Sequence, residues 1–303
     1  MGAMRMTTLD RLLPMLPEDA ARAARGCAGE LREIRLRAGR PVQLVCGGGD
    51  LLTDEVVDAA RLRRIAAALM DYSVYAREDE LSQGFFTLPD GCRVGVCGRL
   101  VGDGDRLRLS AIGSICVRIA RAVPGCADAL VRKMIDGEAL RSALILSPPG
   151  LGKTTMLRDA ARQLSDGGYC VGIADERHEI AACCQGVPSM DVGARSDVID
   201  GCPRSEAVRR LVRSMSPHLI AVDEIGGKED AEALADAARC GVAILATAHG
   251  ASLSDIAARD CLEDLLGGGL VRVVVLLGGR PGQIRRIVEL DGPKEAADAC
   301  RSA

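Results

Sequence analysis

The stretch Ser147-Pro148-Pro149-Gly150-Leu151-Gly152-Lys153-Thr154-Thr155 decides the fold. It follows the apolar run Ala143-Leu144-Ile145-Leu146 and opens a pattern typical of a helix. The phosphate-binding loop is a glycine-rich turn that ends in Lys-Thr and connects a strand to a helix. In this loop, backbone N–H groups and the positive end of the helix dipole face the phosphates. The sequence therefore predicts a nucleoside triphosphatase.

The residues of this loop have distinct expected roles. The ammonium group of Lys153 reaches the β- and γ-phosphate oxygens, and the Thr154 hydroxyl is placed to bind Mg²⁺. Ser147 stands where the pattern has glycine, and a serine can make the same turn if its φ is negative. The predicted nucleotide-binding residues are Pro149, Gly150, Leu151, Gly152, Lys153, Thr154 and Thr155.

Strand-like and helix-like segments alternate after residue 140. Strands are expected over 143–146, 169–174, 219–222 and 242–247, and helices over 204–215 and 229–240, with a long polar loop before residue 204. This alternation predicts a parallel sheet with its site at the carboxyl ends of the strands. Residues 271–277 and 284–290 have the pattern of a terminal hairpin.

The first 125 residues follow a different pattern. Short strands are expected over 33–37, 42–45, 84–88, 93–96 and 114–119, and a helix from Asp58 to Tyr72. Pro89-Asp90-Gly91 between two of the strands is a hairpin signal. We therefore predict a smaller α+β domain over residues 1–125 and an α/β domain over residues 126–303.

A second apolar run ends in two carboxylates, Leu219-Ile220-Ala221-Val222-Asp223-Glu224. This is the arrangement expected of a Walker B segment, in which Asp223 joins Thr154 at Mg²⁺ and Glu224 positions the attacking water as a base. A buried strand with acidic residues at its exit is the alternative. The phosphate-binding loop upstream favours the catalytic interpretation.

Two other predicted strands end in polar segments. Ile173-Ala174-Asp175-Glu176-Arg177-His178-Glu179 leaves one strand where the sheet edge meets nucleotide, which makes Glu176 or Asp175, and Arg177, candidate catalytic residues. A solvated loop is the alternative. Thr247-Ala248-His249-Gly250 ends another strand, so Thr247 and His249 are candidates for sensing the γ-phosphate.

Arginine residues supply two further hypotheses. Arg195 lies in the polar segment 191–198, where a guanidinium in cis or from a neighbouring subunit would stabilise transition-state charge. A surface ion pair with Asp197 is its alternative. A basic helix face for nucleic acid, or for solvent and acidic partners, is predicted from Arg204, Arg209, Arg210 and Arg213. The lack of interleaved aromatic residues favours the second of these.

The composition limits the remaining classes. The chain has 303 residues, a formal net charge of −3, 2% aromatic residues and 13 cysteines. This charge excludes a global basic field that would hold the protein on nucleic acid or anionic lipid. Scattered cysteines and the lack of a recognisable signal peptide predict reduced thiols in the cytosol, with any membrane attachment peripheral.

Taken together, several segments resemble the stage III sporulation protein AA family, an ATPase family related to the motor ATPases of bacterial secretion and type IV pilus systems. Besides the phosphate-binding loop, they are Glu33-Ile34-Arg35-Leu36-Arg37, Gly91-Cys92-Arg93-Val94-Gly95, Arg118-Ile119-Ala120-Arg121, Asp175-Glu176-Arg177, Asp191-Val192-Gly193, Asp200-Gly201-Cys202-Pro203, Arg213-Ser214-Met215-Ser216-Pro217 and Thr247-Ala248-His249-Gly250.

The resemblance implies a RecA-like ATPase domain with a mainly parallel sheet behind a smaller N-terminal domain, and ATP and Mg²⁺ as cofactors. It implies a ring of subunits, expected to be a hexamer, on the cytoplasmic side of a membrane. The implied partners are membrane-embedded components of a secretion-like channel, with no obligatory nucleic acid. In related motors an acidic and a histidine segment line the nucleotide site, and Asp175-Glu176 and His249 are similar to these.

Three other functions stay open from the sequence. A nucleic-acid-dependent P-loop ATPase is suggested by the shared core and the arginine helix. A small-molecule kinase would also use a phosphate-binding loop, although no lid signature is visible. A nucleotide-gated scaffold would bind ATP and scarcely hydrolyse it.

Overall fold

The computed structural model describes residues 7–70, 81, 84–88, 90–102, 108–119, 122–137, 139–183, 186–253, 255, 265–266 and 268–290. Five residues of predicted segments, Asp71, Tyr72, Pro89, Ala120 and Arg121, lie outside these ranges. The chain divides into two compact units, Met1–Ala120 (unit 1) and Arg121–Ala303 (unit 2).

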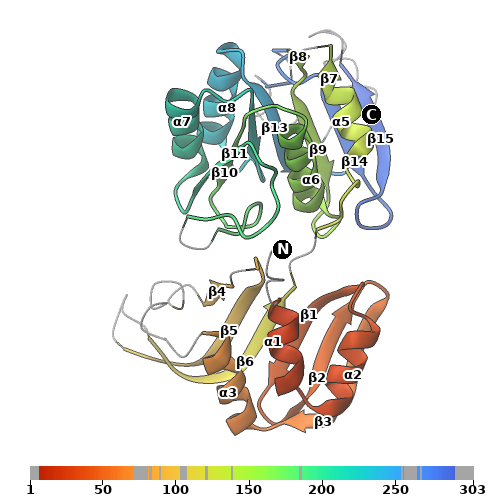
Figure 1. Ribbon diagram of the computed structural model, residues 1–303, viewed down its shortest axis with the longest axis vertical. Coiled ribbons are helices and arrows are strands. Elements are labelled where there is room, and N and C mark those ends of the chain that lie inside the picture. Colours follow the sequence, from red (N-terminus) through yellow and green to blue (C-terminus); the bar gives the residue numbers. More distant parts are fainter. Residues whose placement is uncertain are drawn as a thin grey trace. The chain divides into compact units, whose positions relative to one another are not determined.

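Unit 1 is built on a six-stranded antiparallel sheet with the strand order β3-β2-β1-β6-β5-β4 (Figure 1). Its strands are β1 (Leu31–Arg37), β2 (Arg40–Cys46), β3 (Gly49–Val57), β4 (Phe85–Thr87), β5 (Arg93–Val101) and β6 (Arg108–Arg118). Its helices are α1 (Thr8–Leu12), η1 (Leu13–Met15), α2 (Glu18–Gly26) and α3 (Ala59–Leu69). Alternation along β1 buries Ile34 and Leu36 in a core shared with these helices, while Glu33 and Arg35 stay partly exposed.

Unit 2 contains a seven-stranded sheet with the order β11-β10-β12-β13-β9-β14-β15. Its strands are β9 (Ala143–Ser147), β10 (Val171–Asp175), β11 (Ser196–Asp200), β12 (Leu219–Val222), β13 (Ala243–His249), β14 (Val273–Leu277) and β15 (Ile284–Glu289). All neighbours are parallel except β15, which pairs antiparallel with β14. A small separate hairpin is formed by β7 (Ile135–Asp136) and β8 (Ala139–Leu140).

Helices cover both faces of this sheet (Figure 1). They are α5 (Asp128–Met134), α6 (Lys153–Asp166), α7 (Arg204–Met215) and α8 (Lys228–Arg239). Successive residues of β9 enter opposite cores, because side chains alternate along a strand. Leu144 packs with α7 and α8, whereas Ile145 packs with α5 and α6. The predicted class, a mainly parallel α/β sheet after a smaller domain of strands and helices, is confirmed.

Local differences from the prediction concern edge strands and short helices. The segment expected to be a long polar loop contains β11, an edge strand whose residues are all partly exposed. The unpredicted β3 is also an edge strand, and most of its residues are exposed. Neither strand shows the alternation of buried and exposed residues on which strand prediction depends. The short helices α1 and α2 were not predicted either.

The strand order brings four carboxyl ends to one edge of the sheet of unit 2. These ends belong to β10, β12, β13 and β9, which are consecutive neighbours. The last residues of β13 and β9, His249 and Ser147, are register partners. The edge therefore collects the phosphate-binding loop and every predicted polar strand end. Within the described part of the chain, no helix is both long and apolar enough to cross a membrane.

Candidate nucleotide site

The phosphate-binding loop connects β9 to α6 through two glycines in left-handed conformations. Gly150 has φ 76° and Gly152, the residue before α6, has φ 91°, values that a side chain makes unfavourable. Ser147 ends β9 and is fully buried, so the strand accommodates a serine where the general pattern has glycine. The loop thus has the turn-then-helix geometry that phosphate binding requires.

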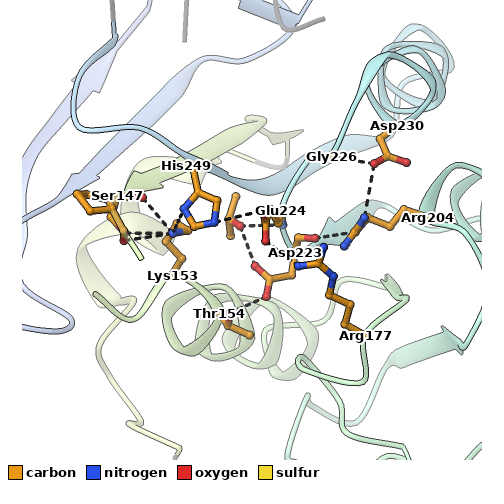
Figure 2. Close-up of polar contacts among 12 residues, drawn as sticks. Ser147, Lys153, Thr154, Arg177, Arg204, Asp223, Glu224, Gly226, Asp230 and His249 are labelled. Atoms are coloured by element: carbon orange, nitrogen blue, oxygen red, sulfur yellow. Dashed lines mark hydrogen bonds and ion pairs between the residues drawn. The ribbon is translucent and has the colours of Figure 1, made fainter. Parts of the chain in front are cut away.

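Lys153, the first residue of α6, points back into the loop (Figure 2). Its Nζ donates to the carbonyl oxygens of Ser147 at 3.0 Å and Pro148 at 3.3 Å, and lies 3.2 Å from His249 Nδ1. Burial lowers the pKa of the ammonium group, and the Asp223 and Glu224 carboxylates oppose this shift. Phosphate oxygens would replace the weak neutral acceptors around Lys153 with charged ones.

The two predicted metal ligands lie side by side. Thr154 Oγ1 donates to Asp223 Oδ2 at 2.6 Å, and Thr247 Oγ1 donates to Asp223 Oδ1 at 2.7 Å. One hydroxyl and one carboxylate suit Mg²⁺, which takes few protein ligands and completes its shell with phosphate oxygens and water. In the described ranges, no cluster of three or more His, Cys, Asp or Glu residues could hold a metal ion alone. The site therefore fits a metal that arrives with a nucleotide.

Glu224 lies directly after Asp223, and its carboxylate is held at both oxygens (Figure 2). Oε2 is 3.0 Å from Arg177 Nη1, and Oε1 is 3.1 Å from His249 Nε2. If Lys153 donates to His249 Nδ1, then the ring hydrogen is on Nε2 and is donated to Glu224. Lys153, His249, Glu224 and Arg177 thus form a continuous polar chain across the sheet edge.

The neighbouring acidic segment contains two residues with different environments. Asp175 is buried, and its carboxylate accepts backbone N–H groups from Glu179 at 2.8 Å, Ile180 at 3.1 Å and Ala181 at 2.8 Å. It therefore holds the loop after β10. Glu176 instead pairs with Arg204 and lines a small pocket together with Asp223 and Glu224.

The structure corrects the prediction of one continuous basic face on α7. Arg204, the first residue of that helix, is 7% exposed and pairs with Glu176, whereas Arg210 and Arg213 are exposed. Sequence reasoning missed this role because it grouped the four arginines, although the helical period places Arg204 on the opposite face of α7 from Arg209, Arg210 and Arg213. Its position directly after Pro203, at the start of the helix, was the available signal, since a cation there is opposed by the helix dipole.

Arg195 is not brought to this cluster within one chain. It precedes β11, so it lies toward the amino-terminal edge of the sheet, and its contacts are with Ser165 near the end of α6. In the structure Arg195 therefore contacts Ser165, where the sequence suggested an ion pair with Asp197. A cavity of about 540 Å³ also lies at this opposite edge, lined in part by Tyr169, His218 and Cys240.

The fold and the site together define a P-loop domain with the architecture of secretion and pilus motor ATPases. The structure resembles the ATPase DotB of Legionella pneumophila with a TM-score of 0.63 at 18% identity, over 99% of this chain and 89% of that chain. It resembles the pilus retraction motor PilT, solved with bound ADP, with a TM-score of 0.63 at 15% identity, over 91% and 84% of the two chains. At these identities the likeness concerns the fold.

Sequence similarity places the chain more closely. Residues 22–294 match the family described as sporulation stage III, protein AA. The chain is 38% identical over 271 residues to stage III sporulation protein AA of Bacillus subtilis (strain 168). The matched region covers 87% of this chain and 88% of that protein. It therefore belongs to the stage III sporulation protein AA family. A plant protein, SEEDLING PLASTID DEVELOPMENT 1 of Arabidopsis thaliana, is 35% identical over 164 residues, 53% of this chain and 23% of its own length.

Proposed function

We propose that this protein binds ATP with Mg²⁺ and hydrolyses it as a motor. The observation that carries the proposal is the pair formed by Thr154 and Asp223, 2.6 Å apart, with Glu224 following in sequence. A hydroxyl from the phosphate-binding loop and a carboxylate directly after β12, two strands away from β9, are the two protein ligands that Mg²⁺ needs beside a triphosphate. DotB is an ATPase and PilT was solved with bound ADP, which agrees with this use of the shared fold.

Different residues of the chain bind the phosphates, hold the metal and activate the attacking water. Backbone N–H groups of residues 150–155 and the ammonium group of Lys153 bind and orient the phosphates. Thr154 and Asp223 would hold Mg²⁺, which would supply positive charge beside the phosphates. Glu224 orients the attacking water and accepts its proton. Arg177 and Glu176 complete the charged lining of the site.

The contacts of His249 suggest how nucleotide prepares Glu224. In the structure His249 touches Lys153 through Nδ1 and Glu224 through Nε2. Phosphate oxygens attract the Lys153 ammonium away from the ring and from Ser147. His249 is then free to reorient toward the γ-phosphate, and one oxygen of Glu224 becomes available for water.

The same proposal includes an assembly. Subunits form a ring, expected to be a hexamer, on the cytoplasmic side of a membrane and drive membrane-embedded components of a secretion-like channel. Arg195 lies away from the site of its own chain, which leaves a neighbouring subunit as the place where it would act as an arginine finger.

Steady-state ATP hydrolysis measured against protein concentration tests the proposal, with wild type and Glu224→Gln compared. We expect specific activity to rise with concentration and to be lost in the variant, which still binds nucleotide. Activity that does not depend on concentration would indicate a monomeric enzyme. Equal loss of binding and turnover in Glu224→Gln would show that Glu224 is a structural residue.

A nucleic-acid-dependent ATPase is the alternative. Its support is reduced because Arg204 is buried and Arg210 is paired with Glu206 at 2.7 Å. Addition of single-stranded DNA or RNA at low salt distinguishes the two functions. A rise in turnover with either polymer would favour the alternative, and no binding would exclude it.

A further inference from the structure

Arg204 combines nearly complete burial with an unfavourable location. It is 7% exposed and is the first residue of α7, where the positive end of the helix dipole disfavours a cation. Arginine is almost never buried to this degree unless it is paired. The surrounding groups must therefore compensate for both effects.

The guanidinium of Arg204 contacts groups from three other segments, and Figure 2 shows two of them, Asp223 and Asp230. Its Nε donates to the carbonyl oxygen of Asp223 at 2.9 Å. Its Nη1 lies 2.5 Å from Glu176 Oε2 and 3.7 Å from Asp230 Oδ2. Asp230, in α8, also accepts the backbone N–H of Gly226 at 3.0 Å. Arg204 thus meets both ends of the turn from Asp223 to Gly226.

That turn holds Glu224 in a left-handed backbone conformation, with φ 57°. A residue with a side chain adopts this region only when its surroundings impose it. On one side Thr247 accepts the Glu224 N–H at its Oγ1 and the Ile225 N–H at its carbonyl oxygen, at 2.8 and 2.9 Å. On the other side lie Arg204 and Asp230.

The space around the turn is tight on the Arg204 side. A Cβ atom added to Gly226 would lie 3.2 Å from Asp230 Oδ2 and 3.4 Å from Arg204 Nη1. The planar guanidinium therefore fits closely against the backbone, and the same Nη1 also pairs with the Glu176 carboxylate. Lysine has a single donor group and cannot reproduce this fork.

We propose that Arg204 is a positioning residue for hydrolysis, which holds the turn that presents Glu224 and orients the Glu176 carboxylate toward the nucleotide. This inference rests on the proposed ATP hydrolysis. It assigns Arg204 no contact with the nucleotide, so its removal should affect the catalytic step and leave nucleotide binding by the phosphate-binding loop intact.

The test compares Arg204→Met and Arg204→Lys with Arg210→Met. Arg210 is a matched control because it is an exposed arginine of the same helix, paired with Glu206. For Arg204→Met we expect kcat to fall about tenfold or more while KM for ATP and the Kd for ADP stay within about twofold. Arg204→Lys should keep part of the rate, and Arg210→Met should match wild type.

Amide hydrogen exchange gives a second readout that does not need turnover. The N–H groups of Glu224 and Ile225 donate to Thr247, and the N–H of Gly226 donates to the Asp230 carboxylate. We expect them to exchange faster in Arg204→Met than in wild type or Arg210→Met, while the amides of β12 stay protected.

The outcomes separate the inference from the proposed function. Unchanged kcat or unchanged exchange in a folded Arg204→Met protein overturns the inference, as does an equal loss of binding and turnover. If wild type hydrolyses no ATP, the proposed function fails, and exchange alone still decides whether Arg204 holds the turn. If Arg204→Met does not fold, the ratio of kcat to KM effects in Arg204→Lys decides.

Discussion

A single hydroxyl group, that of Thr247, connects the predicted metal ligand to the predicted base. Its hydrogen is donated to Asp223 Oδ1, and its oxygen accepts the N–H of Glu224. In this structure the hydroxyl is used by Asp223 and Glu224, and the suggestion that Thr247 senses the γ-phosphate stays a prediction. Thr247 is fully buried and fixes the relative positions of the two acidic residues.

Replacement of Thr247 by valine keeps the shape of the side chain and removes the hydroxyl. Asp223 Oδ1 and the Glu224 N–H then lose a buried partner, and we expect a stability loss of about 1–3 kcal/mol together with lower turnover. Urea unfolding and ATP hydrolysis measure the two effects. Thr247→Ser keeps the hydroxyl and should retain most of the rate, and a serine variant as slow as the valine variant would contradict this role.

Lys153 and Glu224 belong to the same polar chain, but their substitutions should affect different properties, nucleotide affinity for Lys153 and turnover for Glu224. Lys153→Ala removes the ammonium group that contacts Ser147 and Pro148 of the phosphate-binding loop and should weaken the binding of ADP by at least about tenfold. Glu224→Gln should leave that affinity within about twofold and abolish turnover. Titration of fluorescent ADP separates the two variants. If Lys153→Ala and wild type bind ADP with equal affinity, Lys153 does not bind the phosphates.

At the scale of elements, the turn of the hairpin β14–β15 contacts the phosphate-binding loop. Gly282, in the turn of the hairpin, donates its N–H to the carbonyl oxygen of Leu151 at 2.8 Å. A Cβ atom added to Gly152 would lie 3.1 Å from the nitrogen of Gly282. The hairpin turn therefore supports the phosphate-binding loop from a distant part of the sequence.

Two glycines at opposite ends of α6 allow this support to be tested. Both Gly152 and Gly168 have left-handed φ values, 91° and 107°, but nothing lies within 4 Å of a Cβ added to Gly168. Alanine at either site should cost about 1 kcal/mol of stability from backbone strain. Only Gly152→Ala should also weaken ADP binding, because it displaces the hairpin turn. Equal ADP affinity in the two variants would contradict this expectation.

Elements with a clear apolar pattern were predictable, including the edge strands β4 and β15, whereas the edge strands β3 and β11 were not. The bounds of α7 and β12 agree with the predicted 204–215 and 219–222, because α7 places apolar residues at helical spacing and β12 is a short continuous apolar run. The strands β3 and β11 lack this signal. The residues of the candidate site were found from their motifs, whereas the buried environment of Arg204 depends on Glu176 and Asp223, which only the folded chain brings near.

At the scale of the whole molecule, Arg195 supplies a test of assembly. If it acts in a neighbouring subunit, Arg195→Ala and Glu224→Gln are each inactive but have complementary defects. Random mixing of the two proteins should recover roughly a quarter of the wild-type rate, the share of interfaces that combine an intact Arg195 with an intact Glu224. Hydrolysis is measured after the variants are mixed and allowed to exchange subunits. A mixture no faster than its components, when exchange is shown by a fluorescent label, would contradict a role in trans.

Glu224 occupies a backbone conformation that suits glycine better than any residue with a Cβ atom. Its ion pairs with Arg177 and His249 are too exposed to offset much of this strain, since the three side chains are 32%, 55% and 36% exposed. A library screened for heat resistance alone would therefore enrich glycine at position 224 and yield robust proteins without turnover. In such an experiment, the gain in stability on replacing Glu224 by glycine would measure how much stability the chain loses by keeping this carboxylate.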